Sequence, residues 1–250
     1  MHLKVVWAQT PELGDQIAKT AGIAHVATEM TDMIGKVDGI LLLRDDPENH
    51  RKMAQPFIDA GVPIFVDKPL CSTTEDLGYF KDEISKGKFI MSCSSMRYAG
   101  ECRAVKTEIK SYGELKLITA VGKKDWLKYG VHMLEAIFYL VDDIAPVSVT
   151  NAGREGKDIV IIEFENGLQA VVHLYMDVAP TFQISVFGKD KWKLIEIKNS
   201  YAMFRDNIIE VIRSLQEGKP RLEFWKTEQI MKVVIAGLRS LEQKGKKIYL

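Results

Sequence analysis

Short apolar runs alternate with amphipathic helical patterns along the first part of the chain. The stretches between the runs carry helix signals, such as the N-cap and early proline of Thr10-Pro11-Glu12. Strands that alternate with helices of about 10 to 15 residues indicate βαβ units and a parallel sheet. The apolar runs fall at residues 3–7, 40–44, 64–66 and 89–91, with a weaker one at 24–27.

The pattern changes in the rest of the chain. Apolar runs at residues 159–164 and 168–176 are joined by Glu165-Asn166-Gly167, and Asn-Gly between two such runs is a strong hairpin signal. A second pair, at residues 182–187 and 192–197, meets around Gly188. With two closing helices at residues 204–217 and 227–243, this half is predicted to be an antiparallel sheet packed with helices.

The sequence therefore predicts an α/β fold in two parts. Residues 1–97 would form an abbreviated Rossmann-like, doubly wound parallel sheet, and residues 98–250 an α+β domain with an open antiparallel sheet. One broad apolar face is expected on the second sheet, and such a face predicts a homo-oligomer interface. The candidates for that face are Ile159, Ile161, Val171 and Leu174.

Composition excludes several classes of function. Lys plus Arg and Asp plus Glu number 34 each in 250 residues, so no basic field exists to attract nucleic acid or anionic lipid. The apolar runs are too short to cross a membrane, and the N-terminus lacks the layout of a signal peptide, so we expect a cytoplasmic protein. Cys71, Cys93 and Cys102 lack C-x-x-C spacing, so no metal site is expected.

The most informative segment is Asp67-Lys68-Pro69, which directly follows the apolar run at residues 64–66. In open α/β sheets, ligands bind outside the carboxyl ends of the strands, so Lys68 is placed for chemistry. No G-x-G-x-x-G segment occurs anywhere in the chain. The sequence thus combines the catalytic end of a dinucleotide enzyme with the loss of the usual phosphate-binding turn.

Five segments together resemble the glucose–fructose oxidoreductase/inositol dehydrogenase (Gfo/Idh/MocA) family. Their order along the chain matches the family from about residue 3 to the C-terminus. The segments are Asp45-Asp46-Pro47 through His50, Asp67-Lys68-Pro69, Ser95-Met96-Arg97-Tyr98, Gly130 to Glu135 around His132, and Ile184 to Gly188.

The resemblance implies an oxidoreductase that uses NAD or NADP and acts on a sugar, a polyol or a similar small hydroxy or carbonyl compound. It makes Lys68 and His132 the catalytic residues: Lys68 contacts the reacting oxygen, and His132 transfers a proton. It also implies cofactor-binding roles for Asp45, Pro47, His50, Asp67, Pro69 and Arg97, and substrate-binding roles for Lys128 and Tyr98.

The chain departs from the family in ways that predict a degraded nucleotide site. The opening strand, glycine-rich turn and helix have no counterpart, and Ala8, Gln9 and Thr10 stand where an acid would bind the ribose hydroxyls. Lys128 replaces an Asp that the family often has four residues before the histidine. The alternative function is therefore a non-catalytic relative that binds a small molecule or a partner subunit.

The missing first strand also raises a question about the sheet. We expect residues 3–7 to move into or near its central position, giving a sheet of about five strands. Alternatively, a segment that precedes the present N-terminus fills that position. An unfilled position would leave backbone groups unpaired.

Each candidate residue also has a purely structural interpretation. Lys68 could be an ordinary surface lysine, and His132 could be a helix histidine satisfied against the sheet. Arg97 could pair with an acid at the domain junction. Lys128 could be solvated, or paired with Glu135 or Asp125. Lys123-Lys124 could attract an anionic substrate, although adjacent lysines are usually only solvated.

Overall fold

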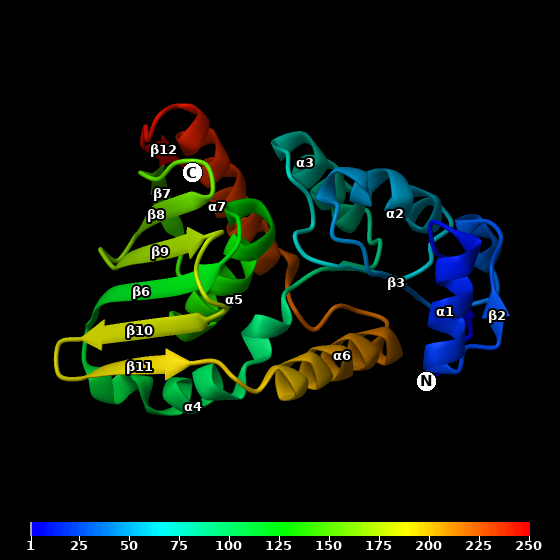
Figure 1. Cartoon of the computed structure of the whole chain (residues 1–250), viewed down its shortest axis with the longest axis horizontal. Coiled ribbons are helices and arrows are strands. Elements are labelled where there is room, and N and C mark those ends of the chain that lie inside the picture. Colours follow the sequence, from blue (N-terminus) through cyan, green and yellow to red (C-terminus); the bar gives the residue numbers. More distant parts are fainter. Residues whose placement is uncertain (1) are drawn as a thin grey trace.

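The computed structural model describes residues 2–250, which form a smaller part with short parallel strands and a larger part built on one broad sheet (Figure 1). The predicted fold class is confirmed by this arrangement. The elements of the smaller part are β1 (Val5–Val6), α1 (Pro11–Ala21), β2 (His25–Val26), a 3₁₀ turn (Met30–Met33), β3 (Ile40–Leu42), a 3₁₀ turn (Pro47–Asn49), α2 (His50–Asp59), β4 (Ile64–Val66), α3 (Thr74–Ser85) and β5 (Ile90–Met91).

The parallel strands form two sheets, not one. β3, β4 and β5 pair in that order, whereas β1 pairs only with β2. The expected five-stranded sheet is therefore wrong. The βαβ unit β1–α1–β2 places its two strands side by side, and nothing in residues 2–250 enters the position between β1 and β3.

A short junction leads into the larger part. It contains a 3₁₀ turn (Ser95–Tyr98), α4 (Gly100–Glu108) and a second 3₁₀ turn (Ile109–Tyr112). The elements that follow are β6 (Leu115–Lys123), a π-helical turn (Trp126–Gly130), α5 (Val131–Leu140), β7 (Pro146–Asn151), β8 (Lys157–Phe164), β9 (Gln169–Tyr175), β10 (Phe182–Gly188), β11 (Trp192–Glu196), α6 (Ser200–Glu217), α7 (Phe224–Glu242) and β12 (Ile248–Tyr249).

The larger sheet has seven strands in the order β11-β10-β6-β9-β8-β7-β12. Its pairs are antiparallel except β6 and β9, which run parallel. The predicted hairpin at Asn166-Gly167 is confirmed, with Gly167 at a φ of 80°. Gly can adopt this left-handed conformation without the steric cost that a side chain would add.

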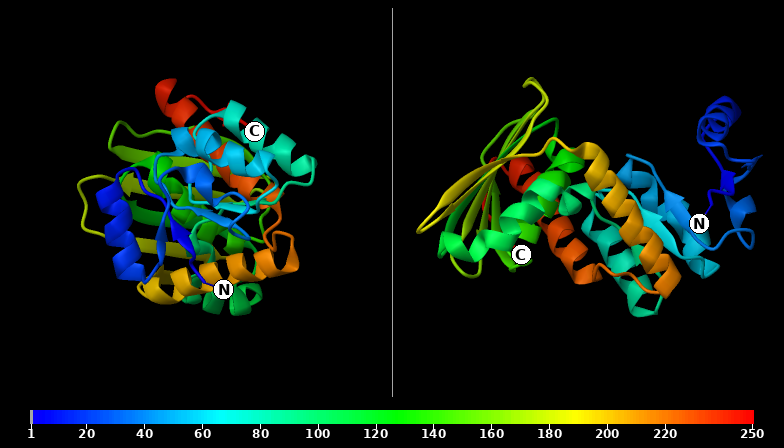
Figure 2. Two further views of the ribbon diagram at one scale, coloured as in Figure 1. Left: turned by 90° about the vertical axis from the view of Figure 1, so that its right-hand side faces the viewer. Right: turned by 90° about the horizontal axis from the view of Figure 1, so that it is seen from below.

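Helices α5 and α7 cover one face of the large sheet, and the other face is open (Figure 2). Along β8, buried and half-buried residues alternate, so Ile159 and Ile161 lie on the open face. Val171, paired with Ile161 across the strands, lies there as well. Leu174 was assigned to this face incorrectly: it is fully buried, because it stands an odd number of residues from Val171 and so points to the helix side.

Two further observations concern membrane spans and metal sites. In residues 2–250, no helix has both the length and the apolar character needed to cross a membrane. The same residues contain no group of three His, Cys, Asp or Glu side chains that could hold a metal ion.

Trp126 fixes the contact between the π-helical turn and α7. Its buried indole donates a hydrogen bond from Nε1 to the Val234 carbonyl at 2.9 Å, and it lies against Gly130 and Gly237. A Cβ atom at Gly237 would overlap the indole ring. Packing against Trp126 therefore requires glycine at position 237 of α7.

We predict that Gly237→Ala destabilises the protein although Ala favours helix, because overpacking a core costs about 1–3 kcal/mol. For a chain of this size, that lowers the thermal midpoint by roughly 2–10 °C. Gly78→Ala on α3 is the matched control, since no atom outside the local helix backbone lies within 4 Å of its Cβ position. It should leave the midpoint unchanged or raise it. Equal midpoints for the two variants would contradict this packing.

Candidate active site

Lys68 lies at the carboxyl end of β4, where the sequence placed it. Its side chain is only 16% exposed, and Nζ is 4.0 Å from Asp67 Oδ2. Burial raises the pKa of the Asp67 carboxyl, and the charge of Lys68 partly offsets that effect. Nζ also lies 6.0 Å from the centre of the Tyr129 ring, so the ammonium group points towards the larger part of the protein.

His132 lies in the first turn of α5, across the junction from Lys68. Its Nδ1 is 2.6 Å from Ser94 Oγ, which follows β5. The same Oγ accepts a hydrogen bond from the Met96 amide at 3.1 Å. A hydroxyl oxygen accepts two hydrogens, so it can also accept one from Nδ1–H and leave the Nε2 lone pair free.

Two aromatic rings and a second lysine surround this histidine. The ring centres of Tyr129 and Phe182 lie 5.0 and 6.0 Å from that of His132. Lys124 Nζ donates to the Tyr129 hydroxyl at 2.6 Å and lies 4.3 Å from the centre of that ring. Strands β6 and β10 and the π-helical turn thus bring Lys124, Phe182 and Tyr129 to one place.

The surroundings hold His132 neutral. Burial, together with the positive charges of Lys68 and Lys124, lowers the pKa of its imidazole to about 3. Both causes disfavour the imidazolium form, the first by desolvation and the second by like-charge repulsion. At neutral pH the ring is therefore uncharged, with one ring nitrogen protonated and the lone pair of the other free to accept a hydrogen bond or a proton.

The strand-end segment at β3 forms its own polar network. Arg44 Nε donates to Asp46 Oδ1 at 2.7 Å and Asn49 Nδ2 to Asp46 Oδ2 at 2.8 Å, which together lower the pKa of the Asp46 carboxyl. Asp45 is exposed and lies 3.4 Å from Lys128 Nζ. The Lys128–Asp45 pair thus links the two parts of the protein at the rim of the site, a partner that the sequence did not suggest.

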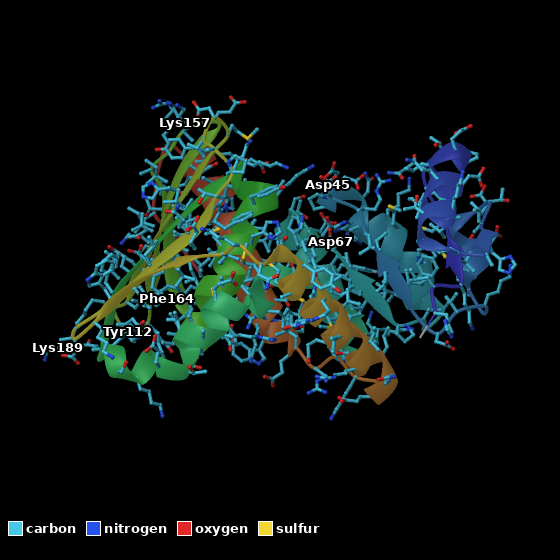
Figure 3. All side chains as sticks on the ribbon, turned by 60° about the horizontal axis from the view of Figure 1, so that its bottom comes forward. Asp45, Asp67, Tyr112, Lys157, Phe164 and Lys189 are labelled. Atoms are coloured by element: carbon cyan, nitrogen blue, oxygen red, sulfur yellow. The ribbon has the colours of Figure 1, made fainter. Side chains whose placement is uncertain are left out.

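His50 and Pro47 are buried beneath this rim. The two ring nitrogens of His50 lie 3.0 Å from the Arg44 carbonyl and 3.2 Å from the Leu70 carbonyl. The imidazole therefore ties the turn after β3 to the turn after β4. Figure 3 shows Asp45 and Asp67, from these two turns, in the middle of the molecule.

Arg97 is almost fully buried in an ion network. Nε donates to Glu135 at 2.5 Å, and Nη2 donates to Asp143 Oδ1 at 2.6 Å. Glu135 also accepts the Ser94 amide at 3.0 Å. The pairing of Arg97 with junction acids is thus observed, while its role in cofactor binding stays a prediction.

Tyr98 is also buried, and burial strongly raises the pKa of its hydroxyl. It lines a cavity of about 270 Å³ together with Arg103, Lys106 and Asp143. Neither Lys68 nor His132 lines that cavity. A substrate contact by Tyr98 stays a prediction and lies apart from the Lys68 cluster.

Sequence reasoning missed Ser94, Tyr129 and Phe182 and gave Lys124 little weight. Tyr129 lies three residues before His132, which places the two side chains on one side of a helical segment. Ser94 follows a buried strand end, the same signal that identified Lys68. Phe182 carried no signal, because only the pairing of β10 with β6 brings it to the site.

Residues 2–250 do not fit a whole dinucleotide. A pyrophosphate needs a glycine-rich turn at a helix N-terminus, and the only glycine near the start of α1 is Gly14. Gly14 lies inside that helix, and a Cβ there would come within 2.9 Å of Val26 Cγ1, so it serves helix–strand packing. The strand ends that carry Lys68 and Asp45 are present, whereas the phosphate cradle is not.

Comparison with known proteins identifies the fold. No family model and no curated protein matches the chain. Solved structures do match: GenD2 from gentamicin A biosynthesis in complex with NAD has a TM-score of 0.88 at 15% identity, covering 100% of this chain and 89% of that one. Myo-inositol 2-dehydrogenase from Lactobacillus plantarum has a TM-score of 0.86 at 14% identity, covering 100% and 92%.

A third similar structure is myo-inositol dehydrogenase from Lactobacillus casei in complex with NAD(H) and myo-inositol. Its TM-score is 0.85 at 14% identity, and the match covers 99% of this chain and 88% of that one. The predicted resemblance to dehydrogenases of the Gfo/Idh/MocA type is thereby confirmed at the level of the fold.

We predict that the His132 imidazole stays neutral at pH 5, where an ordinary histidine, with a pKa near 6.5, is protonated. Nitrogen-15 chemical shifts of labelled histidine report this state directly. Lys68→Met should raise the pKa of His132, because it removes a nearby positive charge. Lys88→Met is the control, because Lys88 is half-buried just before β5 and is not among the charges that shift the pKa of His132.

The folded-state pKa lies below the unfolded one, so the unfolded chain binds this proton first as pH falls. The contribution of His132 to stability is therefore complete above about pH 6.5 and is lost as the pH falls towards 3. A His132 resonance that titrates near pH 6.5 in the folded protein would contradict this account of the site.

Proposed function

We propose that this protein is an oxidoreductase that acts on a sugar, a polyol or a similar small hydroxy or carbonyl compound, with NAD or NADP as the cofactor. The observation that carries the proposal is the meeting of Lys68 and His132 around Tyr129. The Lys68 ammonium lies 6.0 Å from the centre of that ring, and the imidazole centre lies 5.0 Å from it. A positively charged group and a neutral imidazole thus share a site.

Lys68 supplies positive charge for the oxygen that reacts. An ammonium group beside a hydroxyl stabilises the alkoxide that develops when the proton leaves, and a partly buried site strengthens this effect. The low exposure of Lys68 and its position at a strand end fit this role. Lys124, held against Tyr129, adds a second positive charge beside the same ring.

His132 accepts the proton in this proposal. With Nδ1–H donated to Ser94 Oγ, the Nε2 lone pair faces the substrate oxygen. Arg97 supports this arrangement from behind, because Glu135 binds both its guanidinium and the Ser94 amide. Arg97 and Glu135 are therefore positioning residues for the Ser94–His132 pair.

The nicotinamide cofactor would supply hydride chemistry, and its binding residues in this chain are the strand-end turns. Asp45, Pro47, Asp67 and Pro69 stand at the ends of β3 and β4, and His50 joins the two turns from below. The absence of a phosphate cradle in residues 2–250 makes nucleotide affinity low. Substrate contacts are assigned to Lys128 at the rim and to Tyr98, which would contact only a part of the substrate that extends to its separate cavity.

The open face of the large sheet supports a homo-oligomer. Ile159, Ile161 and Val171 contribute half-buried apolar side chains to it, and Val121 is more exposed still. A second copy of the sheet would cover this apolar face.

The missing phosphate cradle favours a second candidate function, a non-catalytic relative that keeps the small-molecule site but has abandoned hydride transfer. The two functions differ in one observable. The first requires nucleotide binding by the folded chain, and the second does not.

We predict that millimolar NAD(H) or NADP(H) raises the thermal unfolding midpoint by roughly 1–5 °C, with one of the two nucleotide pairs clearly preferred. A ligand at about 100 times its dissociation constant would add roughly 2.7 kcal/mol, and the incomplete site keeps the gain below that value. AMP, which lacks the nicotinamide, is the matched control ligand. No shift with any of the four nucleotides would leave the non-catalytic function as the better account.

A further inference from the structure

The position between β1 and β3 is a groove of about 890 Å³. β1 and β3 form its two sides, and helices α1, α2 and α6 also contribute to its walls. Its lining is largely apolar and includes Trp7, Leu13, Ile17, Leu41, Phe57 and Leu215.

Backbone groups of both strands point into this groove. In β3, Ile40 N donates to Pro63 O and Leu42 O accepts from Asp67 N, so these two residues bond towards β4. Parallel strands use alternate residues for each neighbour, so Leu41 presents its N–H and C=O to the opposite side. Within residues 2–250, Leu41 has no backbone partner on that side.

The same alternation holds in β1. Val6 O accepts from Ala27 N at 2.8 Å, so Val6 bonds towards β2. Val5 and Trp7 therefore present their backbone groups to the other side, where the described residues offer them no backbone partner. Two strand edges thus border one groove, each with unpaired donors and acceptors.

The groove also exposes apolar side chains to an unusual degree. Leu3 and Leu43, which line it beside the two strands, are 56% and 64% exposed. A small apolar molecule would cover these side chains but leave the backbone groups unpaired. An extended peptide covers the side chains and pairs both edges at once.

We propose that this groove binds an extended, apolar segment of a partner polypeptide, which pairs as a strand with β1 on one side and β3 on the other. β-Branched residues suit the segment, because they favour extended backbone and would be enclosed by apolar walls. The groove runs along β1 from Leu3 to Gln9, so a segment of about five to seven residues fits it at roughly 3.3 Å per residue.

The segment would join the two parallel sheets into one. The groove also borders Arg44, Asp45 and Asp46, so one end of the bound segment lies beside the rim of the candidate active site. If the proposed function holds, the partner segment therefore contributes backbone groups next to the nucleotide. Binding of the segment itself does not depend on that function.

The test is amide hydrogen exchange, followed by NMR, with a synthetic peptide as the probe. The peptide has five alternating valine and isoleucine residues, flanked by two lysines at each end. It should slow exchange at the Val5, Trp7 and Leu41 amides at least tenfold. A peptide with proline at the second and fourth of the five positions keeps the apolar character but lacks those N–H groups, and it should give no protection.

Matched protein variants locate the binding site. Leu13→Lys, on the groove wall, should weaken binding of the valine–isoleucine peptide at least tenfold. Tyr201→Lys is the control, because Tyr201 is 76% exposed on α6 and does not line the groove. Neither variant touches the candidate active site.

Three results would overturn the proposal. Equal binding of both peptides would show that the groove binds apolar ligands without strand pairing. No binding of either peptide would show that the edges do not accept a strand. Protection of the three amides in the free chain, together with a dimer in sedimentation, would assign the groove to a second copy of this chain.

Discussion

The buried ion network of Arg97, Glu135 and Asp143 is the constraint on which the site depends. One guanidinium from the junction turn binds Glu135 of α5 and Asp143 just after it, and all three side chains lie away from water. Removing one member of such a network strands an unpaired buried charge, at a cost of about 3–5 kcal/mol. Helix α5 carries both His132 and Glu135, and Glu135 also accepts a hydrogen bond from the Ser94 amide. The network therefore positions both residues of the Ser94–His132 hydrogen bond.

The chemistry of the site follows from burial combined with like charge. Desolvation and two lysines make the imidazolium unfavourable, so His132 is a neutral acceptor beside the Lys68 ammonium group at the edge of the site. These groups come from both parts of the molecule: Lys68 follows β4, Lys124 follows β6, and Phe182 begins β10. A change in how the two parts pack would therefore alter the electrostatics of the site as well as the contacts across it.

The sequence predicted those features that local patterns encode. A buried strand followed by Asp67-Lys68-Pro69 located Lys68 correctly at a strand end, and Asn166-Gly167 located a hairpin. Contacts between distant elements could not be predicted from local patterns, and nothing local joins Ser94 to His132. The Lys128 ammonium pairs with Asp45, whereas Asp125 accepts a hydrogen bond from the Lys128 backbone amide only. The predicted position of β1 in one five-stranded sheet was wrong, because β1 pairs with β2 through the connection formed by α1. The resemblance indicated only that a central strand was missing.

The most direct test of the central claim, that Lys68 and His132 form an oxidoreductase site, is steady-state nicotinamide reduction with a panel of polyols and sugars. Millimolar concentrations of NAD or NADP compensate for the low nucleotide affinity expected of the incomplete site. The account predicts turnover of at least one compound, a loss of roughly a hundredfold or more in kcat for Lys68→Met, and normal turnover for Lys88→Met. Turnover that survives Lys68→Met unchanged, or no turnover of any compound with either nucleotide, would contradict it.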